Sequence, residues 1–257
     1  MINRIPYGRN KPMVGGQLNL SHPLARGLVV RWLFNEQGGT RLNDISGRGN
    51  HGTLINGPVW NNRTLSFDGG NDYVSLGDIT SAFTNQEATF TVWVKRNLHT
   101  PLSQENTGSW SFNNQAWGSH YVWTNGQIYD GSFKYERTDV GAGIVSDRTQ
   151  WHHIAITRKS GENGWKFYQN GIEIASASGG TWQMNTSIKI GQSSTSPGYP
   201  DFYFTGLLDD IRIYNRALSA QEVRELYVNP YADMLMPRNR NFAQPALFRK
   251  YGFFHAA

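Results

Sequence analysis

Aspartates in glycine-rich stretches are the side chains of this sequence best suited to hold a metal ion. Ca²⁺ takes about six to eight oxygen ligands, from carboxylates and backbone carbonyls on loops that glycine allows to bend sharply. The predicted ligands of a structural calcium ion are Asp44, Asp68, Asp72, Asp209 and Asp210, of which Asp44 and Asp209 are the first choice. The alternative is that Asp44, Asp68 and Asn71 make Asx-turns and cap backbone N–H groups.

A second group of candidates lies in the stretch 109–130, where aromatic residues alternate with amide side chains. Exposed aromatic rings stack on the apolar faces of sugars, and amide groups bond to sugar hydroxyls. The predicted carbohydrate-binding residues are Trp110, Trp117, His120 and Tyr121. The alternative is that alternate aromatic residues of this stretch fill the core between two sheets. Because Trp110 and Trp117 lie near turns rich in Gly and Asn, we expect these two to be exposed.

The sequence contains no combination of residues typical of a catalytic site. It has no Gly-x-Ser-x-Gly elbow, no His-Glu-x-x-His pair and no phosphate-binding loop. His152 and His153 are consecutive in a predicted strand, so they point to opposite faces and cannot bind one metal ion together. We therefore predict that the protein is not an enzyme.

Short strands account for most of the chain that would position these residues. The chain has 257 residues and no cysteine, and only 17% of its residues are charged, which excludes disulfides and disfavours a coiled coil. Asn125-Gly126 and Asn170-Gly171 each predict a two-residue hairpin turn between strands. One helix is predicted over 220–228, with Ser219 as its N-cap and Glu222 at the capping-box spacing. Strands are predicted over 27–34, 64–67, 72–76, 89–95, 121–124, 127–129, 151–158, 166–169, 172–175, 187–190 and 208–214. This pattern indicates an antiparallel sandwich.

Seven segments, in order, resemble the laminin-G-like members of the concanavalin A-like lectin/glucanase superfamily. They read GLVVRWLFNE (27–36), DISGRGNHGTL (44–54), LSFDGGNDYV (65–74), FTVWV (90–94), WHHIAIT (151–157), YQNGI (168–172) and FTGLLDDIRIYNRALS (204–219). The resemblance implies an all-β jelly-roll sandwich of two antiparallel sheets. The lead SHPLARG (21–27) is similar to a version of this domain in phage and environmental viral genomes.

The resemblance also bears on catalysis and on metal binding. Many glucanases of this superfamily use two Glu flanking an Asp on one strand, which places both carboxylates on the same face. No Glu-x-Asp-x-Glu occurs in this sequence, and Glu136 and Asp139 would point to opposite faces of a strand. In this family calcium is often held by residues from segments like those of the predicted aspartates.

Positive charge is concentrated at the two ends of the chain. Of the net charge of +5, residues 1–26 carry +4 and residues 228–257 carry +3, which leaves −2 for the centre. We predict a basic N-terminal arm (1–26), a sandwich (27–227) and a basic, aromatic C-terminal arm (228–257). The predicted partner-binding residues are Arg4, Arg9, Lys11, Arg238, Arg240, Phe248, Arg249, Tyr251 and Phe253. A protein partner is favoured over nucleic acid, although aromatic residues between basic ones also suit base stacking.

The leading hypothesis is a non-enzymatic virion structural protein, either a capsid decoration or an attachment subunit. The arms would dock on capsid or other virion proteins and on further copies of the chain, and the lectin-like domain would face host glycans on the virion surface after synthesis in the host cytoplasm. No apolar run is long enough to span a membrane, and the basic N-terminus is not followed by the apolar region of a secretory signal. The alternatives are a carbohydrate-binding module at a cell surface or outside the cell and, third, a glycoside hydrolase.

Overall fold

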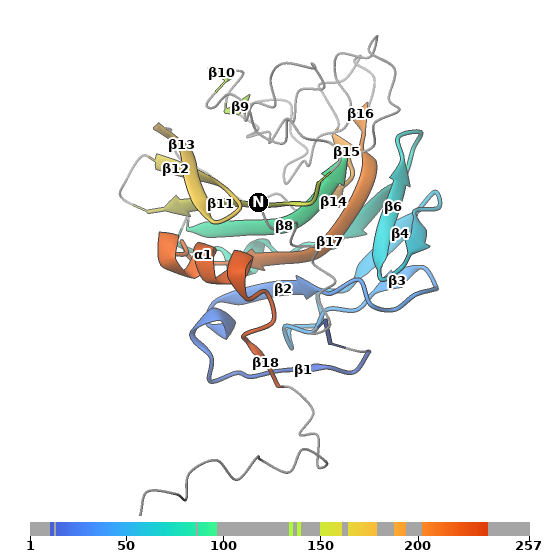
Figure 1. Cartoon of the computed structure of the whole chain (residues 1–257), viewed down its shortest axis with the longest axis horizontal. Helices are drawn as coiled ribbons and strands as arrows, with labels where there is room; N and C mark the ends of the chain where they lie inside the picture. Colours follow the sequence, from blue (N-terminus) through green and yellow to red (C-terminus); the bar gives the residue numbers. More distant parts are fainter. Residues whose placement is uncertain are drawn as a thin grey trace, which may run out of the picture.

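The computed structural model of the chain describes residues 11–12, 14–85, 87–96, 134–135, 138–139, 150–160, 164–178, 188–193 and 202–235. Within these ranges the chain consists mainly of antiparallel strands, with a single α-helix near the end (Figure 1). No helix among the described residues is long and apolar enough to cross a membrane.

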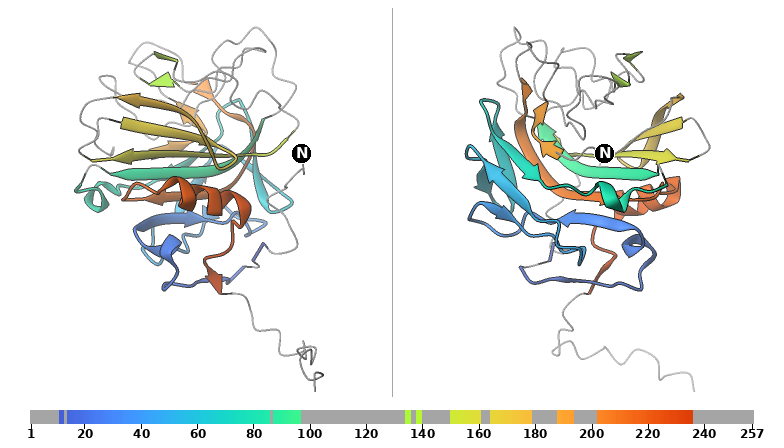
Figure 2. Two further views of the ribbon diagram at one scale, coloured as in Figure 1. Left: turned by 60° about the vertical axis from the view of Figure 1, so that its left-hand side comes forward. Right: turned by 180° about the vertical axis from the view of Figure 1, so that it is seen from behind.

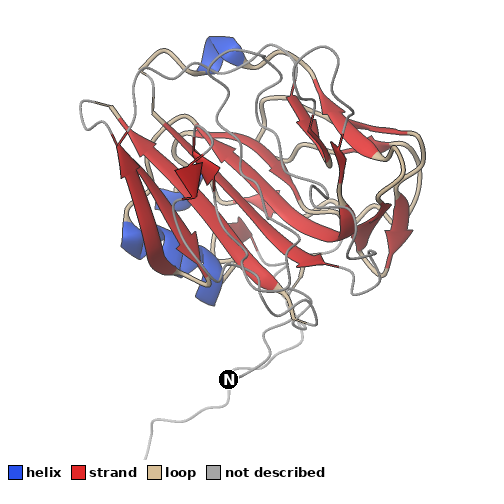
Figure 3. Cartoon of the chain, turned by 90° about the horizontal axis from the view of Figure 1, so that it is seen from above, coloured by secondary structure: helices blue, strands red, loops and turns tan. Residues whose placement is uncertain are grey.

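The larger sheet contains eight of the described strands. The strand order is β13 (Ile172–Ser178), β12 (Gly164–Gln169), β11 (His152–Lys159), β8 (Ala88–Arg96), β17 (Thr205–Tyr214), β6 (Thr64–Asp68) and β5 (Val59–Asn61). β17 is long enough to pair with β6 along its first half and with β2 (Leu28–Trp32) along its second half. Viewed from above, the strands cross the molecule side by side, with the helix at one side (Figure 3).

The second sheet covers one face of the larger sheet. It consists of β14 (Ile188–Ile190), β7 (Tyr73–Leu76), β4 (Gly52–Ile55) and β3 (Arg41–Leu42). Alternate residues of both sheets point into the space between them and form the main core, which includes Trp32, Phe67, Val74, Phe90 and Ile213. The predicted all-β jelly-roll sandwich is confirmed.

Shorter elements complete the described chain. They are β1 (Gln17–Leu18) with β18 (Met234–Leu235), β9 (Lys134–Tyr135) with β10 (Thr138–Asp139), β15 (Gln192–Ser193) with β16 (Phe202–Tyr203), and the 3₁₀ turns η1 (Pro23–Ala25) and η2 (Thr80–Ala82). The predicted hairpin turn at Asn170-Gly171 joins β12 to β13, with φ of 52° and 77° at the two residues. The predicted turn at Asn125-Gly126 lies outside the described residues.

The face of the larger sheet turned away from the second sheet is called here the outer face. It is covered by α1 (Ala220–Val228), η1 and the β1–β18 pair (Figure 2). The predicted capping box begins the helix: the backbone N–H of Glu222 donates to Ser219 Oγ at 3.2 Å, and that of Ser219 donates to Glu222 Oε2 at 2.9 Å. Val223 and Leu226 pack beneath the helix in a second apolar cluster.

The inner parts of both predicted arms lie on the sandwich. β1 comes from the predicted N-terminal arm and β18 from the C-terminal arm, and they pair with each other through Leu18 and Met234. Both residues are buried in the same cluster as Leu218. The domain boundaries near 27 and 227 stay a prediction, and residues 1–10, 13 and 236–257 of the two arms lie outside the described ranges.

Several strands of the larger sheet begin or end at the same end of the sheet. β8 ends and β11 begins there, because Val94 pairs with His152. The start of β17 and the end of β6 lie at the same end, where Thr205 pairs with Asp68 and Gly206 with Arg96. We call this region, at Asp68, Arg96, His152 and Thr205, the loop end of the sheet.

Candidate functional site

A β-bulge in β17 places two consecutive carboxylates on the outer face. In a regular strand Asp209 and Asp210 would point to opposite faces. The pairing of β17 with β8 shifts register between Asp209 and Arg212, and Asp210 adopts a left-handed φ of 41°. This backbone conformation costs a non-glycine residue on the order of 1–3 kcal/mol. The bulge therefore exists because surrounding contacts stabilise it.

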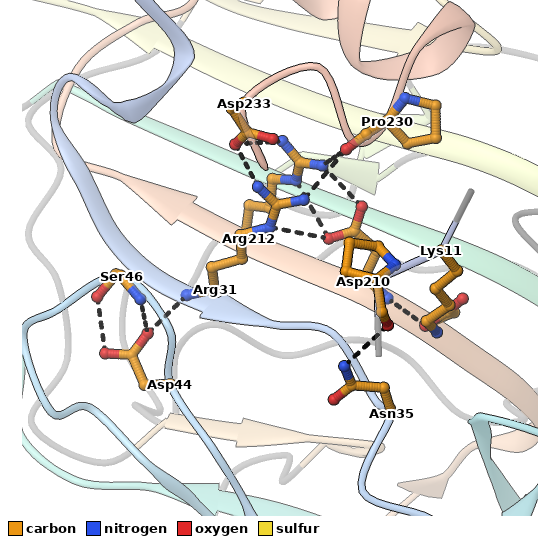
Figure 4. Close-up of polar contacts among 11 residues, drawn as sticks. Lys11, Arg31, Asn35, Asp44, Ser46, Asp210, Arg212, Pro230 and Asp233 are labelled. Carbon is orange, nitrogen blue, oxygen red and sulfur yellow. Dashed lines mark hydrogen bonds and ion pairs between the residues drawn. The ribbon is translucent and has the colours of Figure 1, made fainter. Parts of the chain in front are cut away.

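Two arginines and a third aspartate supply these contacts (Figure 4). Arg212 Nη2 donates to Asp210 Oδ2 at 2.8 Å, and Arg31 Nε lies 3.6 Å from Asp210 Oδ1. Asp233 Oδ2 accepts from both guanidinium groups, at 3.3 Å from Arg212 Nη1 and with a closer contact to Arg31 Nη1. The carbonyl of Pro230 accepts from both arginines as well. Four charged side chains from β2, β17 and the segment after α1 thus form one buried network.

Asp209 has a different cation, because Lys11 reaches it from the N-terminal segment. Lys11 Nζ donates to Asp209 Oδ1 at 2.5 Å and to the carbonyl of Arg63 at 2.7 Å. The Lys11 carbonyl accepts from Arg63 Nη2 at 2.8 Å, and Asn35 Nδ2 donates to the Pro12 carbonyl at 3.1 Å. Lys11 is only 4% exposed, so this predicted partner-binding residue contacts the chain's own sheet.

Burial dominates the electrostatics of this network. It raises the pKa of Asp209 to about 7, although Lys11 acts in the opposite direction. Burial also opposes ionisation of Asp210, but the charges of Arg212 and Arg31 outweigh it and lower the pKa of that carboxyl. His153, which lies on the same face, has its pKa lowered to about 3 by burial and by the charge of Arg212. It is therefore neutral at ordinary pH.

The predicted calcium ligands are divided among separate places. Asp44 accepts the N–H groups of Arg31 and Ser46 on Oδ1 at 2.9 Å each, and that of Asn50 on Oδ2 at 2.9 Å. These are the bonds of the Asx-turn alternative. Asp209 and Asp210 belong to the ion pairs of the outer face.

The remaining two predicted ligands lie together in the turn after β6. Asp68 Oδ1 accepts from the N–H of Gly70 at 2.7 Å, and Asp72 Oδ2 accepts from the N–H of Asp68 at 3.2 Å. Burial raises the pKa of Asp72. Within the described ranges no three His, Cys, Asp or Glu residues converge on a possible metal position. Calcium binding stays a prediction.

The predicted carbohydrate-binding residues, Trp110, Trp117, His120 and Tyr121, lie outside the described residues. So do the predicted partner-binding residues other than Lys11, namely Arg4, Arg9, Arg238, Arg240, Phe248, Arg249, Tyr251 and Phe253. The structure describes the place where the stretch 97–149 leaves and rejoins the sheet, at Arg96 and His152. There His152 Nδ1 lies 2.9 Å from Gln169 Nε2, and both His152 and Trp151 are buried.

Sequence reasoning missed the buried charge network as a unit. Arg31 and Arg212 each interrupt an apolar strand, as in Val30-Arg31-Trp32. A charged residue in a fully buried strand needs a partner, and this signal indicates buried ion pairs. It does not identify Lys11 or Asp233 as partners, because they lie 198 residues from Asp209 and 202 residues from Arg31.

Comparison with known proteins gives a family and a fold. The family profile described as "Concanavalin A-like lectin/glucanases superfamily" matches residues 68–224, more than half of the chain. No curated protein sequence matches.

Among solved structures, a sialidase of Trypanosoma rangeli in complex with sialic acid superposes with a TM-score of 0.61 at 17% identity, over 80% of this chain and 33% of that one. A mutant of that sialidase displaying trans-sialidase activity gives 0.60 at 16% identity, over 85% and 36%. The binding domain of Paraclostridial Mosquitocidal Protein 1 gives 0.58 at 17% identity, over 81% and 53%.

These similarities correct the leading functional hypothesis. The solved structures named above that share the fold are sialidases and the binding domain of Paraclostridial Mosquitocidal Protein 1. The prediction of a virion structural protein is therefore wrong. At these identities the likeness concerns the fold alone, and the chain spans about a third of the sialidase.

Proposed function

The chain belongs to the concanavalin A-like lectin/glucanase superfamily, and from that premise we propose that it is a non-catalytic carbohydrate-binding domain. We place its sugar site in the connection from β8 to β11. The two strands are neighbours in the middle of the larger sheet, yet 55 residues separate Arg96 from His152 in the sequence. This connection holds Trp110, Trp117, His120 and Tyr121. Binding residues are commonly carried by loops on a rigid scaffold.

The loop end supports this proposal because the strands that carry the connection are paired on both sides. β8 pairs with β11 on one side and with β17 on the other, so the connection starts and ends in the middle of the sheet. The next turn along this end, at Asp68–Asp72, is held by the carboxylates of both aspartates. At β15 and β16, Gln192 Nε2 donates to the hydroxyl of Tyr203 at 3.3 Å.

The state of the buried carboxylates supports a non-catalytic role. Glycoside hydrolysis needs two carboxyl groups on either side of a bond in the substrate. Asp209, Asp210 and Asp233 are at most 2% exposed and are paired with Lys11, Arg31 and Arg212. Because they are buried in ion pairs, these carboxylates are not placed to flank a bond of a bound sugar.

A glycan array with the purified chain, followed by titration of the best glycan, tests the proposal. We expect binding that falls about tenfold or more in Trp110→Ala and in Trp117→Ala, which corresponds to a loss of about 1.4 kcal/mol. Trp60→Phe is the matched control, because Trp60 lies on β5 and donates from Nε1 to the Gly39 carbonyl at 2.9 Å, away from the loop end. Equal affinity in all four proteins would overturn the assignment of the site.

A glycoside hydrolase is the second candidate, and the shared fold of the sialidases favours it. It predicts steady release of free sugar from a glycoside. Incubation of the chain with a fluorogenic sialoside and with a panel of other fluorogenic glycosides distinguishes the two candidates. Turnover abolished by one Asp→Asn or Glu→Gln change would establish the enzyme and overturn the binding domain.

A further inference from the structure

A socket on the body of the domain holds two residues of the N-terminal segment. The socket consists of the side chains of Asn35, Arg63 and Asp209 and the Arg63 carbonyl, and its occupant is Lys11–Pro12. The ammonium group donates to Asp209 at 2.5 Å and to the Arg63 carbonyl at 2.7 Å, and the Lys11 carbonyl accepts from Arg63 Nη2 at 2.8 Å. The Pro12 carbonyl accepts from Asn35 Nδ2 at 3.1 Å; Figure 4 shows Lys11 and Asn35. Both residues of the occupant are buried.

The socket matches the ammonium group of a lysine. Asp209 is fully buried, and among the described residues its carboxylate pairs with Lys11, while the two arginines nearby pair with Asp210 and Asp233. A buried carboxylate without a cation is strongly destabilising. The guanidinium group of Arg63 does not serve in its place, because Arg63 Nη2 donates to the carbonyls of Lys11 and Pro12.

The backbone around the socket is strained at three places. Phe34 precedes Asn35 and has a φ of 54°, Arg63 has a φ of 67°, and Asp210 follows Asp209 with a φ of 41°. Residues other than glycine rarely adopt this left-handed backbone conformation, and a bulky residue such as Phe does so least readily. Strained residues that cluster around one site indicate that the site is maintained by its surroundings. The socket is therefore a built feature of the sheet and its turns.

The hydrogen bonds described above for the occupant are made to parts of the chain that are distant in sequence. Asn35 lies 23 residues from Pro12, Arg63 lies 52 residues from Lys11, and Asp209 lies 198 residues from Lys11. The socket is thus complete without the N-terminal segment. An identical segment from another copy of the chain meets the same donors and acceptors.

The link from the occupant to the rest of the fold contains an exposed turn. Val14 is 61% exposed, and Gly15 adopts a φ of 87° with open space around the position of a Cβ atom. β1 follows at Gln17 and pairs with β18. A short exposed turn between a docked segment and a paired strand has the properties of a hinge for exchange between copies.

We propose that two copies of this chain join by exchanging their N-terminal segments, so that Lys11–Pro12 of each copy occupies the socket of the other. In the single copy the chain's own segment fills the socket. The exchange conserves the hydrogen bonds described for the socket and changes the course of the turn that contains Val14 and Gly15. It is independent of sugar binding, because the socket lies on the outer face beside the bulge of β17.

Complementation between two full-length variants tests the proposal. Lys11→Ala keeps a complete socket and loses the ammonium group, whereas Asp209→Asn keeps the ammonium group and loses the carboxylate. Neither variant forms the ion pair alone, but the mixture restores it between unlike chains. In native mass spectrometry we expect a heterodimer in the equimolar mixture that is at least tenfold more abundant than the dimer of either variant alone.

The matched control is the exposed ion pair of β12 and β13, in which Lys166 Nζ lies 3.2 Å from Glu173 Oε2. A mixture of Lys166→Ala and Glu173→Gln stays monomeric. If the socket variants are folded by circular dichroism and their mixture is also monomeric, exchange does not occur.

If either socket variant is unfolded, the exchange is tested with the wild-type chain instead. Unlabelled and ¹⁵N-labelled protein are incubated together at high concentration and examined by native mass spectrometry. A dimer of mixed label that persists on dilution supports the exchange, and a monomer at every concentration overturns it.

Discussion

At the scale of single residues, the outer face contains charge that is buried and balanced. Lys11, Arg31 and Arg212 contribute three positive charges, and Asp209, Asp210 and Asp233 contribute three negative charges. Replacement of such groups by apolar ones is often tolerated, but removal of a single partner leaves an unpaired buried charge. The network therefore connects the segment at Lys11 and the segment after α1 to β17.

The first prediction concerns Arg212, which is 1% exposed and contacts both Asp210 and Asp233. We expect Arg212→Leu to lower the free energy of unfolding by about 3–5 kcal/mol, because it leaves two carboxylates with too little positive charge. Lys166→Leu is the control: its ion pair is half exposed and contributes about 1 kcal/mol or less. Urea denaturation of both variants provides the measurement, and equal losses would contradict the account.

The second prediction concerns the effect of His153 on the pH dependence of the free energy of unfolding. Its pKa is lowered from 6.5 to about 3, so below pH 6.5 the unfolded chain takes up a proton that the folded chain does not. This lowers the free energy of unfolding by up to about 1.4 kcal/mol per pH unit between pH 6.5 and 3. Asp209, with its raised pKa, acts in the opposite sense and is present in both proteins under comparison.

His153→Gln isolates the effect, because glutamine is polar and does not titrate. We expect the stability of the wild type relative to this variant to be constant above pH 7 and to decline steadily from pH 6.5 to pH 4. Urea denaturation at a series of pH values gives the difference. A difference that is flat over the whole range would show that folding does not lower the pKa of His153, and it would contradict the account.

At the scale of elements, the turn between β12 and β13 packs directly against α1. A Cβ atom on Gly171 would lie 3.1 Å from the Cα of Arg224 and 3.3 Å from the Cβ of Tyr227. Tyr227 in turn stacks on Trp93 of β8, with ring centroids 5.7 Å apart. The glycine therefore serves both the turn geometry and the close approach of the helix.

The third prediction separates these two roles of Gly171. Gly171→Ala and Gly39→Ala both place a side chain at a left-handed φ, of 77° and 81°, but only the first meets other atoms. We expect a loss of about 1–2 kcal/mol from the backbone in both variants, with about 1–3 kcal/mol more at Gly171 from overpacking. Thermal unfolding of the two variants measures the difference. Equal losses would mean that α1 adjusts without cost.

At the scale of the whole molecule, short sequence patterns were enough to predict the fold. The buried charge network, in contrast, depends on contacts between residues that are far apart in the sequence. The Asn170-Gly171 turn and the capping box at Ser219 were predictable because a few adjacent residues determine each. The bulge at Asp210 was not, because arginines from other strands stabilise its conformation. The docking of Lys11 on Asp209 joins opposite ends of the sequence. The stretch with Trp110 and Trp117 remains a prediction from composition and from where its ends meet the sheet.

The fourth prediction concerns the central claim, that this molecule binds a carbohydrate and leaves it intact. Native mass spectrometry of the chain with a glycan selected on the array reports binding and cleavage in the same spectrum. We predict a complex whose mass equals that of the chain plus one whole glycan, unchanged after prolonged incubation. A spectrum with free monosaccharide and a shortened glycan, or with no complex for any glycan, would contradict the account.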